Sequence, residues 1–186
     1  FHKGHEYQIA QTKVQSKADF IIAIMSGNFV QRGEVAIFPK EFRAKAALLC
    51  GADLVLEIPT VFSLQSAEFF AEKAVAIAEA TGIVNYLSFG AECDDVNKIL
   101  EIAKLLSDEP PILSKAIKSG LSSGLSYPVS RAMAIKELLD AESGEILSTP
   151  NNILAVEYCK ALCKSASRIT PWAIKRTGAN PDSKEA

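Results

Sequence analysis

Histidine and cysteine are scarce in this chain of 186 residues, which has two histidines and four cysteines. The cysteines have none of the spacings typical of zinc sites, and a chain of this length needs no disulfides to stabilise its core. We therefore expect reduced thiols and a cytoplasmic protein. His2 and His5 have no carboxylate or thiolate at a spacing that would complete a zinc site, so no metal ligands are predicted.

Long apolar runs and an excess of one charge are also absent. No run approaches the ~20 residues of a membrane span, so no membrane partner is expected. The chain has 20 Lys and Arg against 22 Asp and Glu, a net charge of −2. That balance alone predicts no nucleic-acid partner, although a local basic patch can lie on an acidic protein. With 48% hydrophobic and 23% charged residues, the composition excludes intrinsic disorder and is typical of a globular protein.

Short apolar runs alternate with helical patterns in the first half of the chain. The pattern predicts strands at 19–25, 52–58 and 83–89, with helices at 6–16, 39–50 and 67–80. Strands separated by helices are typical of βαβ units and a parallel sheet, so we expect an α/β fold. Further helices are predicted at 95–106, 111–119, 128–139 and 152–164, and one interpretation of 167–176 is a further strand.

The chain is expected to have two parts, an α/β part over residues 1–110 and a mainly helical part over 111–186. The helical part is expected to pack on the carboxyl edge of the sheet, where ligands bind in open α/β folds. Because the chain begins with Phe1 and not with Met, the first element of the fold is expected to be missing.

His2 and His5 flank Gly4 directly before the first predicted helix. Glycine lets a ligand approach the backbone closely, and a helix start supplies free N–H groups and a positive dipole end. Two imidazoles there can donate hydrogen bonds to phosphate oxygens and stabilise the charge that develops when an α-phosphate is attacked. The alternative is a pair of surface histidines near the chain end.

A second group of polar residues follows the first predicted strand. It consists of Ser26, Gly27, Asn28, Gln31 and Arg32, and Lys40 and Arg43 follow on one face of the next helix. A Lys/Arg pair beside a polar loop suits a triphosphate or an RNA backbone. An ordinary surface turn and a solvated helix face would have the same pattern.

Three later positions also suit a nucleotide. Gly90 ends the third predicted strand, where an adenine or ribose could lie against the backbone. Asn151 or Asn152 could read adenine or ribose, or could simply cap the following helix. Lys175 and Arg176 form a basic pair that suits phosphates or a plain surface.

In this order, the motifs resemble the bacterial tRNA(Met) cytidine acetate ligase family, which belongs to the nucleotidyltransferase superfamily with the H-x-G-H motif. The M-S-G-N-F-V-Q-R-G-E stretch is far more specific than H-x-G-H. The matching stretches are 1–5, 25–34, 51–59, 65–68, 89–92, 126–128 and 150–154. They run across nearly the whole chain.

The resemblance implies an ATP-dependent ligase with a Rossmann-like nucleotidyltransferase domain over 1–110 and a helical extension over 111–186 that completes the ATP site. Family members use ATP and Mg²⁺ to activate acetate as acetyl-adenylate. They then acetylate N4 of the wobble cytidine of elongator tRNA(Met), giving N4-acetylcytidine.

The resemblance also implies roles for individual residues. His2, His5 and Arg32 would be catalytic. The residues expected to bind ATP are His2, Gly4, His5, Ser26, Gly27, Asn28, Gly90, either Asn151 or Asn152, and Arg176. On weaker support, contacts with substrate or tRNA would come from Gln31, Lys40, Arg43 and Lys175, with Lys40 and Arg43 as candidates for phosphate or tRNA.

The sequence departs from the family at Lys3, Val35 and Ala91, none of which removes an expected catalytic group. Family chains are longer, so a strand before Phe1 and a C-terminal tRNA-binding region are expected to lie outside this sequence. Two alternatives remain open: a small-molecule adenylyltransferase of the same superfamily, and a non-catalytic nucleotide- or RNA-binding module. The M-S-G-N-F-V-Q-R-G-E stretch argues against the first, and both histidines against the second.

Overall fold

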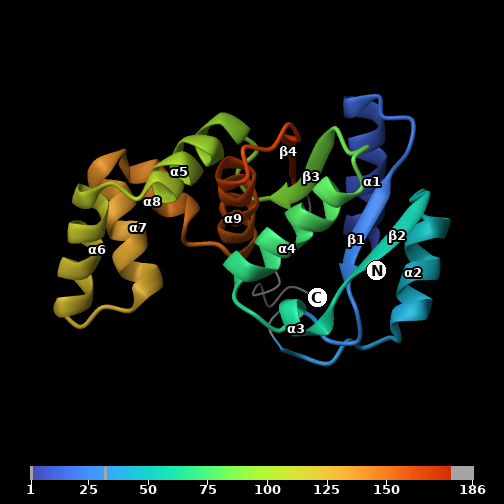
Figure 1. Ribbon diagram of the computed structural model, residues 1–186, viewed down its shortest axis with the longest axis horizontal. Coiled ribbons are helices and arrows are strands. Elements are labelled where there is room, and N and C mark those ends of the chain that lie inside the picture. The colour runs from blue at the N-terminus through green and yellow to red at the C-terminus, as the bar shows by residue number, and fades with distance from the viewer. Residues whose placement is uncertain (1, 32, 177–186) are drawn as a thin grey trace.

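The structure, a computed structural model, describes residues 2–31 and 33–176. Helices and parallel strands alternate through the first half of the chain (Figure 1). In chain order these elements are α1 (Lys3–Ser16), β1 (Ile22–Ser26), α2 (Lys40–Leu49), β2 (Leu54–Ile58), α3 (Thr60–Ser63), α4 (Ala67–Ala80) and β3 (Tyr86–Ala91). Helices then dominate: α5 (Val96–Asp108), α6 (Pro111–Ser122), α7 (Tyr127–Leu138), α8 (Ala141–Ile146) and α9 (Pro150–Lys164), followed by β4 (Thr170–Lys175).

The strands pair in parallel, as the alternating pattern predicts. β1 pairs with β2, and β3 pairs with β4, the last strand of the described chain. The strands are thus arranged as two separate pairs, whereas the pattern predicts one sheet. Residue 110 stays a predicted boundary, and β4 from the second predicted part pairs with β3 from the first.

Helices α4 and α9 connect the two strand pairs. Val75 and Ala78 of α4 form a buried cluster with Ala161 and Leu162 of α9. Ile24 of β1 and Leu87 of β3 both pack against this cluster. A shared apolar layer therefore holds the two pairs in a fixed relation, because separating them would expose the layer to water.

Short helices and exact element boundaries differ from the predictions. The α3 and α8 helices have only four and six residues and are not predicted, because a single turn gives no hydrophobic period. β3 begins at Tyr86, three residues after the predicted start. Gly82, which directly precedes the predicted strand start at residue 83, has φ of +68° and ends the helical turn after α4.

Helices α6, α7 and α8 form one end of the molecule, away from the strands (Figure 1). Their buried residues join the main core, in which Leu113 and Ile135 pack with Ile99 of α5 and Val156 of α9. α6 and α7 approach each other closely: a Cβ built on Gly120 would lie 2.7 Å from the Ser130 Oγ. Glycine therefore permits this helix packing distance.

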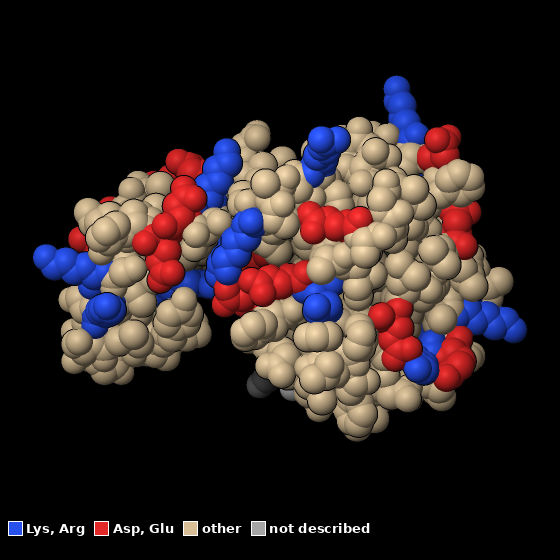
Figure 2. Space-filling model, in the orientation of Figure 1, with Lys and Arg blue, Asp and Glu red and all other residues tan. Residues whose placement is uncertain are grey.

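Opposite charges are intermixed on the surface. Figure 2 shows Lys and Arg beside Asp and Glu across the face in view, with no large region of one sign. Within the described ranges, no helix has the length and apolar character needed to cross a bilayer. All four cysteines are free.

Candidate functional site

A cavity of about 190 Å³ lies where the start of α1 meets the ends of β3 and β4. Its lining residues are His2, Gly4, Tyr7, Gln8, Gly90, Ile174, Lys175 and Arg176. The fold thus unites His2 and Gly4 of the H-x-G-H motif with Gly90 and the basic pair, which are far apart in sequence, whereas His5 is not among the lining residues. A larger hollow of about 260 Å³ lies between α4 and α9, but no predicted site residue lines it.

The two histidines form a reciprocal cap at the start of α1. The backbone N–H of Gly4 donates to the Nδ1 of His2 at 3.0 Å, and the backbone N–H of His2 donates to the Nδ1 of His5 at 3.3 Å. Since each Nδ1 accepts a hydrogen bond, a neutral ring holds its proton on Nε2. A Cβ on Gly4 would lie 2.8 Å from the Cε1 of His2, so the glycine is needed for this arrangement.

Both imidazoles are neutral at pH 7. Partial burial lowers the pKa of His5 to about 4, and the nearby His2 and Arg176 add to the effect. Burial and Arg176 also lower the pKa of His2. His5 as a whole residue is nevertheless exposed. Neutral rings with a proton on Nε2 are hydrogen-bond donors suited to phosphate oxygens.

Helix α1 is attached to the β3–β4 pair through polar contacts. Gln8 donates through Nε2 to the Ser88 carbonyl at 3.3 Å, and the Thr12 and Ser88 hydroxyls are 2.6 Å apart. The Trp172 indole N–H donates to the Gln15 Oε1 at 2.9 Å. No residue of α1 is buried. The orientation of the two histidines therefore depends on the polar face of α1 formed by Gln8, Thr12 and Gln15. The sequence predictions miss this face, although its residues recur at helical spacing.

Gly90 forms one wall of the cavity. A Cβ there would lie 3.4 Å from the Cγ of Arg176 and 3.5 Å from the Oε1 of Gln8. The Arg176 backbone N–H donates to the Ala91 carbonyl at 2.9 Å, which keeps the basic pair beside the end of β3. Lys175 forms an exposed ion pair with Asp94 at 3.4 Å. The lining residues include no carboxylate, so the described wall suits an anion.

The polar loop after β1 lies apart from the cavity lining. Arg43 donates through Nε to the Phe38 carbonyl at 3.1 Å and through Nη2 to the Ser26 and Gly27 carbonyls. Lys40 pairs with Glu57 at 2.7 Å. Both predicted phosphate- or tRNA-binding cations thus have intramolecular partners that hold the loop in place.

Asn28 and Gly27 complete the loop. The Asn28 Oδ1 accepts a hydrogen bond from the Lys40 backbone N–H at 3.3 Å, which caps the start of α2. A Cβ on Gly27 would lie only 2.1 Å from the Oε1 of Glu57. Ser26, Gly27, Asn28 and Gln31 are not among the cavity-lining residues, and Arg32 lies outside the described residues.

Asn151 and Asn152 lie at the start of α9, where they contact the turn after β3. Asn151 donates to Glu92, and Asn152 accepts from the Cys93 backbone N–H. Neither asparagine lines the cavity. In the described part of the chain, no three His, Cys, Asp or Glu side chains are grouped so that they could hold a metal ion.

The chain belongs to the HIGH nucleotidyl transferase family, whose model matches residues 1–186. A Clostridium novyi protein named tRNA(Met) cytidine acetate ligase is 47% identical over 181 residues, which are 96% of this chain and 45% of that protein. A Thermoanaerobacter protein of the same name is 46% identical over 179 residues, again 96% of this chain and 45% of the relative. The chain therefore spans about half the length of the curated relatives it matches. The predicted family resemblance is confirmed.

Solved structures agree with the fold. The structure of Thermotoga maritima TmcAL bound with alpha-thio ATP matches with a TM-score of 0.92 and 39% identity, over 96% of this chain and 44% of that one. The apo structure of the same protein gives a TM-score of 0.95 at 38% identity, over 100% and 45%. These matches confirm the predicted fold, a Rossmann-like α/β nucleotidyltransferase domain followed by a mainly helical region.

Proposed function

We propose that this chain provides the ATP-binding and adenylating site of an ATP-dependent tRNA(Met) cytidine acetate ligase. The observation that supports this most is the cavity, where His2, Gly4, Gly90 and Arg176 meet at the start of α1. Names of relatives agree with this function, and a similar structure was determined with an ATP analogue. ATP, acetate and elongator tRNA(Met) are the proposed substrates.

In the first step, a carboxylate oxygen of acetate attacks the α-phosphorus of ATP. The bond from that phosphorus to the bridging oxygen breaks, and pyrophosphate leaves with the electron pair. The Nε2–H groups of His2 and His5, with Arg176, would donate to phosphate oxygens as negative charge shifts toward the leaving group. No covalent enzyme intermediate is needed, because adenylation itself makes acetate a good acyl donor.

In the second step, the N4 amino group of the wobble cytidine attacks the acetyl carbonyl carbon. AMP leaves with the electrons of the broken C–O bond, and the nitrogen loses a proton to give N4-acetylcytidine. Mg²⁺ is proposed to neutralise triphosphate charge, since this ion prefers phosphate oxygens and water over dedicated protein cages. The described residues form no metal-ligand group, so we assign no residue to it.

The polar loop after β1 is proposed to contact acetate, phosphate or tRNA. Asn28 is exposed, and Gln31 is partly exposed. The loop follows the carboxyl end of β1, and the cavity lies at the carboxyl ends of β3 and β4. Lys40 and Arg43 would act mainly by holding this loop, because their charged groups contact Glu57 and backbone carbonyls. Lys175 and Arg32 are proposed to add positive charge to the substrate-binding site.

The deciding experiment is exchange of labelled pyrophosphate into ATP, measured with and without acetate and with and without tRNA(Met). We expect acetate-dependent exchange that His5→Ala abolishes while leaving the folded structure intact. Absence of acetate-dependent exchange would overturn the proposal. Equal exchange with a phosphorylated small molecule instead of acetate would indicate the alternative adenylyltransferase.

A further inference from the structure

We propose that Glu92 is a positioning residue that holds the Gly90 wall of the cavity in the shape that accepts ATP. The proposal rests on the proposed function, because it concerns the same cavity. Glu92 does not line the cavity. It would act by joining the exit of β3 to the start of α9.

The Glu92 carboxylate accepts three hydrogen bonds from the first turn of α9. The Thr149 hydroxyl donates to Oε2 at 3.0 Å, and the Asn152 backbone N–H donates to the same oxygen at 3.0 Å. The Asn151 amide donates to Oε1 at 2.6 Å. Thr149 is the N-cap residue of α9 and caps no backbone N–H with its own side chain. Glu92 therefore supplies the cap from a distant part of the chain.

The contact is reciprocal. The Cys93 backbone N–H donates to the Asn152 Oδ1 at 2.9 Å, and Asn152 is only 4% exposed. We call the mutual contacts of Glu92 and Cys93 with Thr149, Asn151 and Asn152 the β3–α9 clasp. Because each segment both donates to and accepts from the other, neither can shift alone without leaving a partly buried polar group unpaired.

The clasp adjoins the cavity wall. Glu92 follows Gly90 by two residues, roughly 7 Å along an extended chain. Between them, the Ala91 carbonyl accepts the Arg176 backbone N–H at 2.9 Å. A displacement of this turn would therefore move both Gly90 and Arg176, which line the cavity. The effect on ATP would be indirect, through the position of the backbone.

Charge gives the clasp a second consequence. The start of a helix attracts anions, and α1 and α9 both present such a start near the end of β3. At α9 the carboxylate of Glu92 already occupies this place, whereas the lining of the cavity at α1 has no carboxylate. Glu92 thus disfavours triphosphate binding at α9 and leaves the start of α1 as the open anion site beside β3.

The test is ATP binding by Glu92→Gln, measured by titration calorimetry with ATP. A glutamine keeps one acceptor oxygen and turns an NH₂ group toward donors, so the three hydrogen bonds cannot all persist. We expect at least a tenfold increase in the Kd for ATP, and a higher KM for ATP with little change in kcat. Glu101→Gln is the matched control, since Glu101 is exposed on α5 and its loss of charge leaves the clasp intact.

A second variant guards against a simple loss of folding. Thr149→Val removes one hydroxyl and keeps the shape of the side chain, so we expect a smaller increase of Kd in the same direction. Hydrogen exchange at the Cys93 amide, bonded to Asn152, should become faster in Glu92→Gln and stay unchanged in Glu101→Gln.

The outcomes separate the two proposals. If Glu92→Gln and Thr149→Val both bind ATP within twofold of the unaltered protein, the role of Glu92 is overturned and the proposed function survives. If kcat falls as much as KM rises, Glu92 acts on the chemistry and not by positioning, which also overturns the proposal. If the unaltered protein binds no ATP, the proposed function fails, and the inference fails with it.

Discussion

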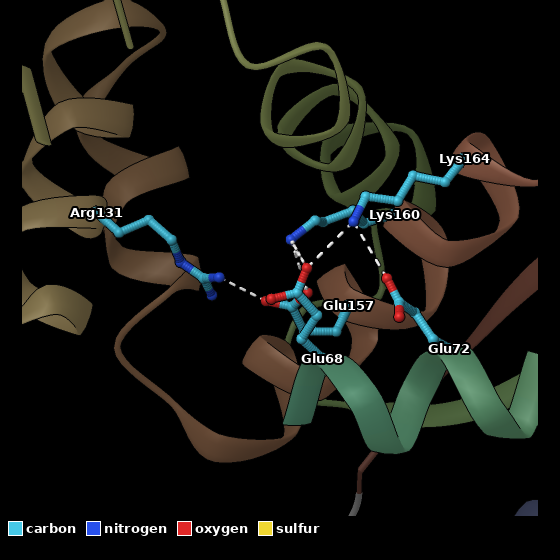
Figure 3. A network of polar contacts seen from close by, with 6 residues as sticks. All are labelled: Glu68, Glu72, Arg131, Glu157, Lys160 and Lys164. Atoms are coloured by element: carbon cyan, nitrogen blue, oxygen red, sulfur yellow. Dashed lines mark hydrogen bonds and ion pairs between the residues drawn. The ribbon is translucent and has the colours of Figure 1, made fainter. Parts of the chain in front are cut away.

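The guanidinium of Arg131 contacts the carboxylate of Glu157 inside the protein, with 2.5 Å between Nη1 and Oε1. The two side chains are only 10% and 3% exposed. Lys160 lies 3.4 Å from the second oxygen of Glu157 and 2.8 Å from Glu68 (Figure 3). A chain of charges therefore runs from α7 through α9 to α4, buried at Arg131, Glu157 and Lys160 and 39% exposed at Glu68. It joins the helical end of the molecule to α4.

Arg131→Met should destabilise the protein strongly. The change leaves Glu157 buried with only Lys160 beside it, and removing one partner of a buried ion pair costs about 3–5 kcal/mol. We expect a loss near 3 kcal/mol in urea unfolding, because Lys160 still offsets part of the charge. Lys175→Met is the control, since its ion pair with Asp94 is exposed and worth at most about 1 kcal/mol. Equal losses for both variants would contradict the importance of burial.

The sequence predicts the α/β class and the parallel direction of the strands because apolar runs and helical periods are local signals. Arg131, Glu157 and Lys160 give no such signal, since a charged residue in a helix normally lies in water. Their pairing across distant helices appears only once α7 and α9 are packed. The division of the strands into two pairs is equally non-local, because edge pairing depends on tertiary packing.

For the site, the sequence identifies residues by type, and the structure shows which of them meet. His2 and Gly90 could be predicted because H-x-G-H and strand-ending glycines have recognisable local patterns. The fold brings both to the cavity together with Arg176. The roles of Asn152 and Arg43 could not be predicted, since their partners Cys93 and the Ser26 carbonyl lie on other elements. Glu92 lies within the matching stretch 89–92, and nothing local shows that it caps α9.

Gly90→Ala should weaken ATP binding without loss of stability. The added methyl group would lie 3.4 Å from Arg176 and 3.5 Å from Gln8, so it fits the folded backbone but enters the cavity. We expect a Kd for ATP at least tenfold higher, by calorimetry, with an unchanged midpoint of thermal unfolding. An unchanged Kd would show that the proposed nucleotide site lies elsewhere.

Gly27→Ala, in contrast to Gly90→Ala, should lower the stability of the folded protein. Its methyl group would collide with the Glu57 carboxylate at 2.1 Å and displace the partner of Lys40. Glu57 is 40% exposed and its carboxylate ends a flexible side chain, so it can turn away from the methyl group, and the loss is that of an exposed ion pair, at most about 1 kcal/mol in a urea titration. Glu57→Ala alone should cost about as much, and adding Gly27→Ala to it should cost nothing further. A further loss in the double variant would mean that backbone strain, and not the carboxylate, causes the effect.

The low pKa of His5 predicts a pH dependence of stability. The folded protein binds a proton at His5 only near pH 4, whereas the unfolded chain binds it near its ordinary pKa of 6.5. Between these values the unfolded state holds more protons, so stability should fall as pH drops from 6.5 to 4. His5→Asn should remove this part of the pH dependence. An NMR titration should give a His5 midpoint near 4, and a midpoint at or above 6.5 would refute the prediction.

Gly120→Ala tests the close packing of α6 on α7. Alanine favours a helix interior over glycine by about 1 kcal/mol, which alone would stabilise the variant. The added Cβ, however, would lie 2.7 Å from the Ser130 Oγ, 2.8 Å from its Cβ and 3.2 Å from its Cα, so rotation of the hydroxyl cannot relieve the contact. Because overpacking costs about 1–3 kcal/mol, we expect a net loss of about 1 kcal/mol in urea unfolding. Ser119→Ala, at an exposed position of the same helix, gains helix propensity without the contact and should be slightly stabilising. A stabilised Gly120→Ala would show that α6 and α7 can separate at little cost.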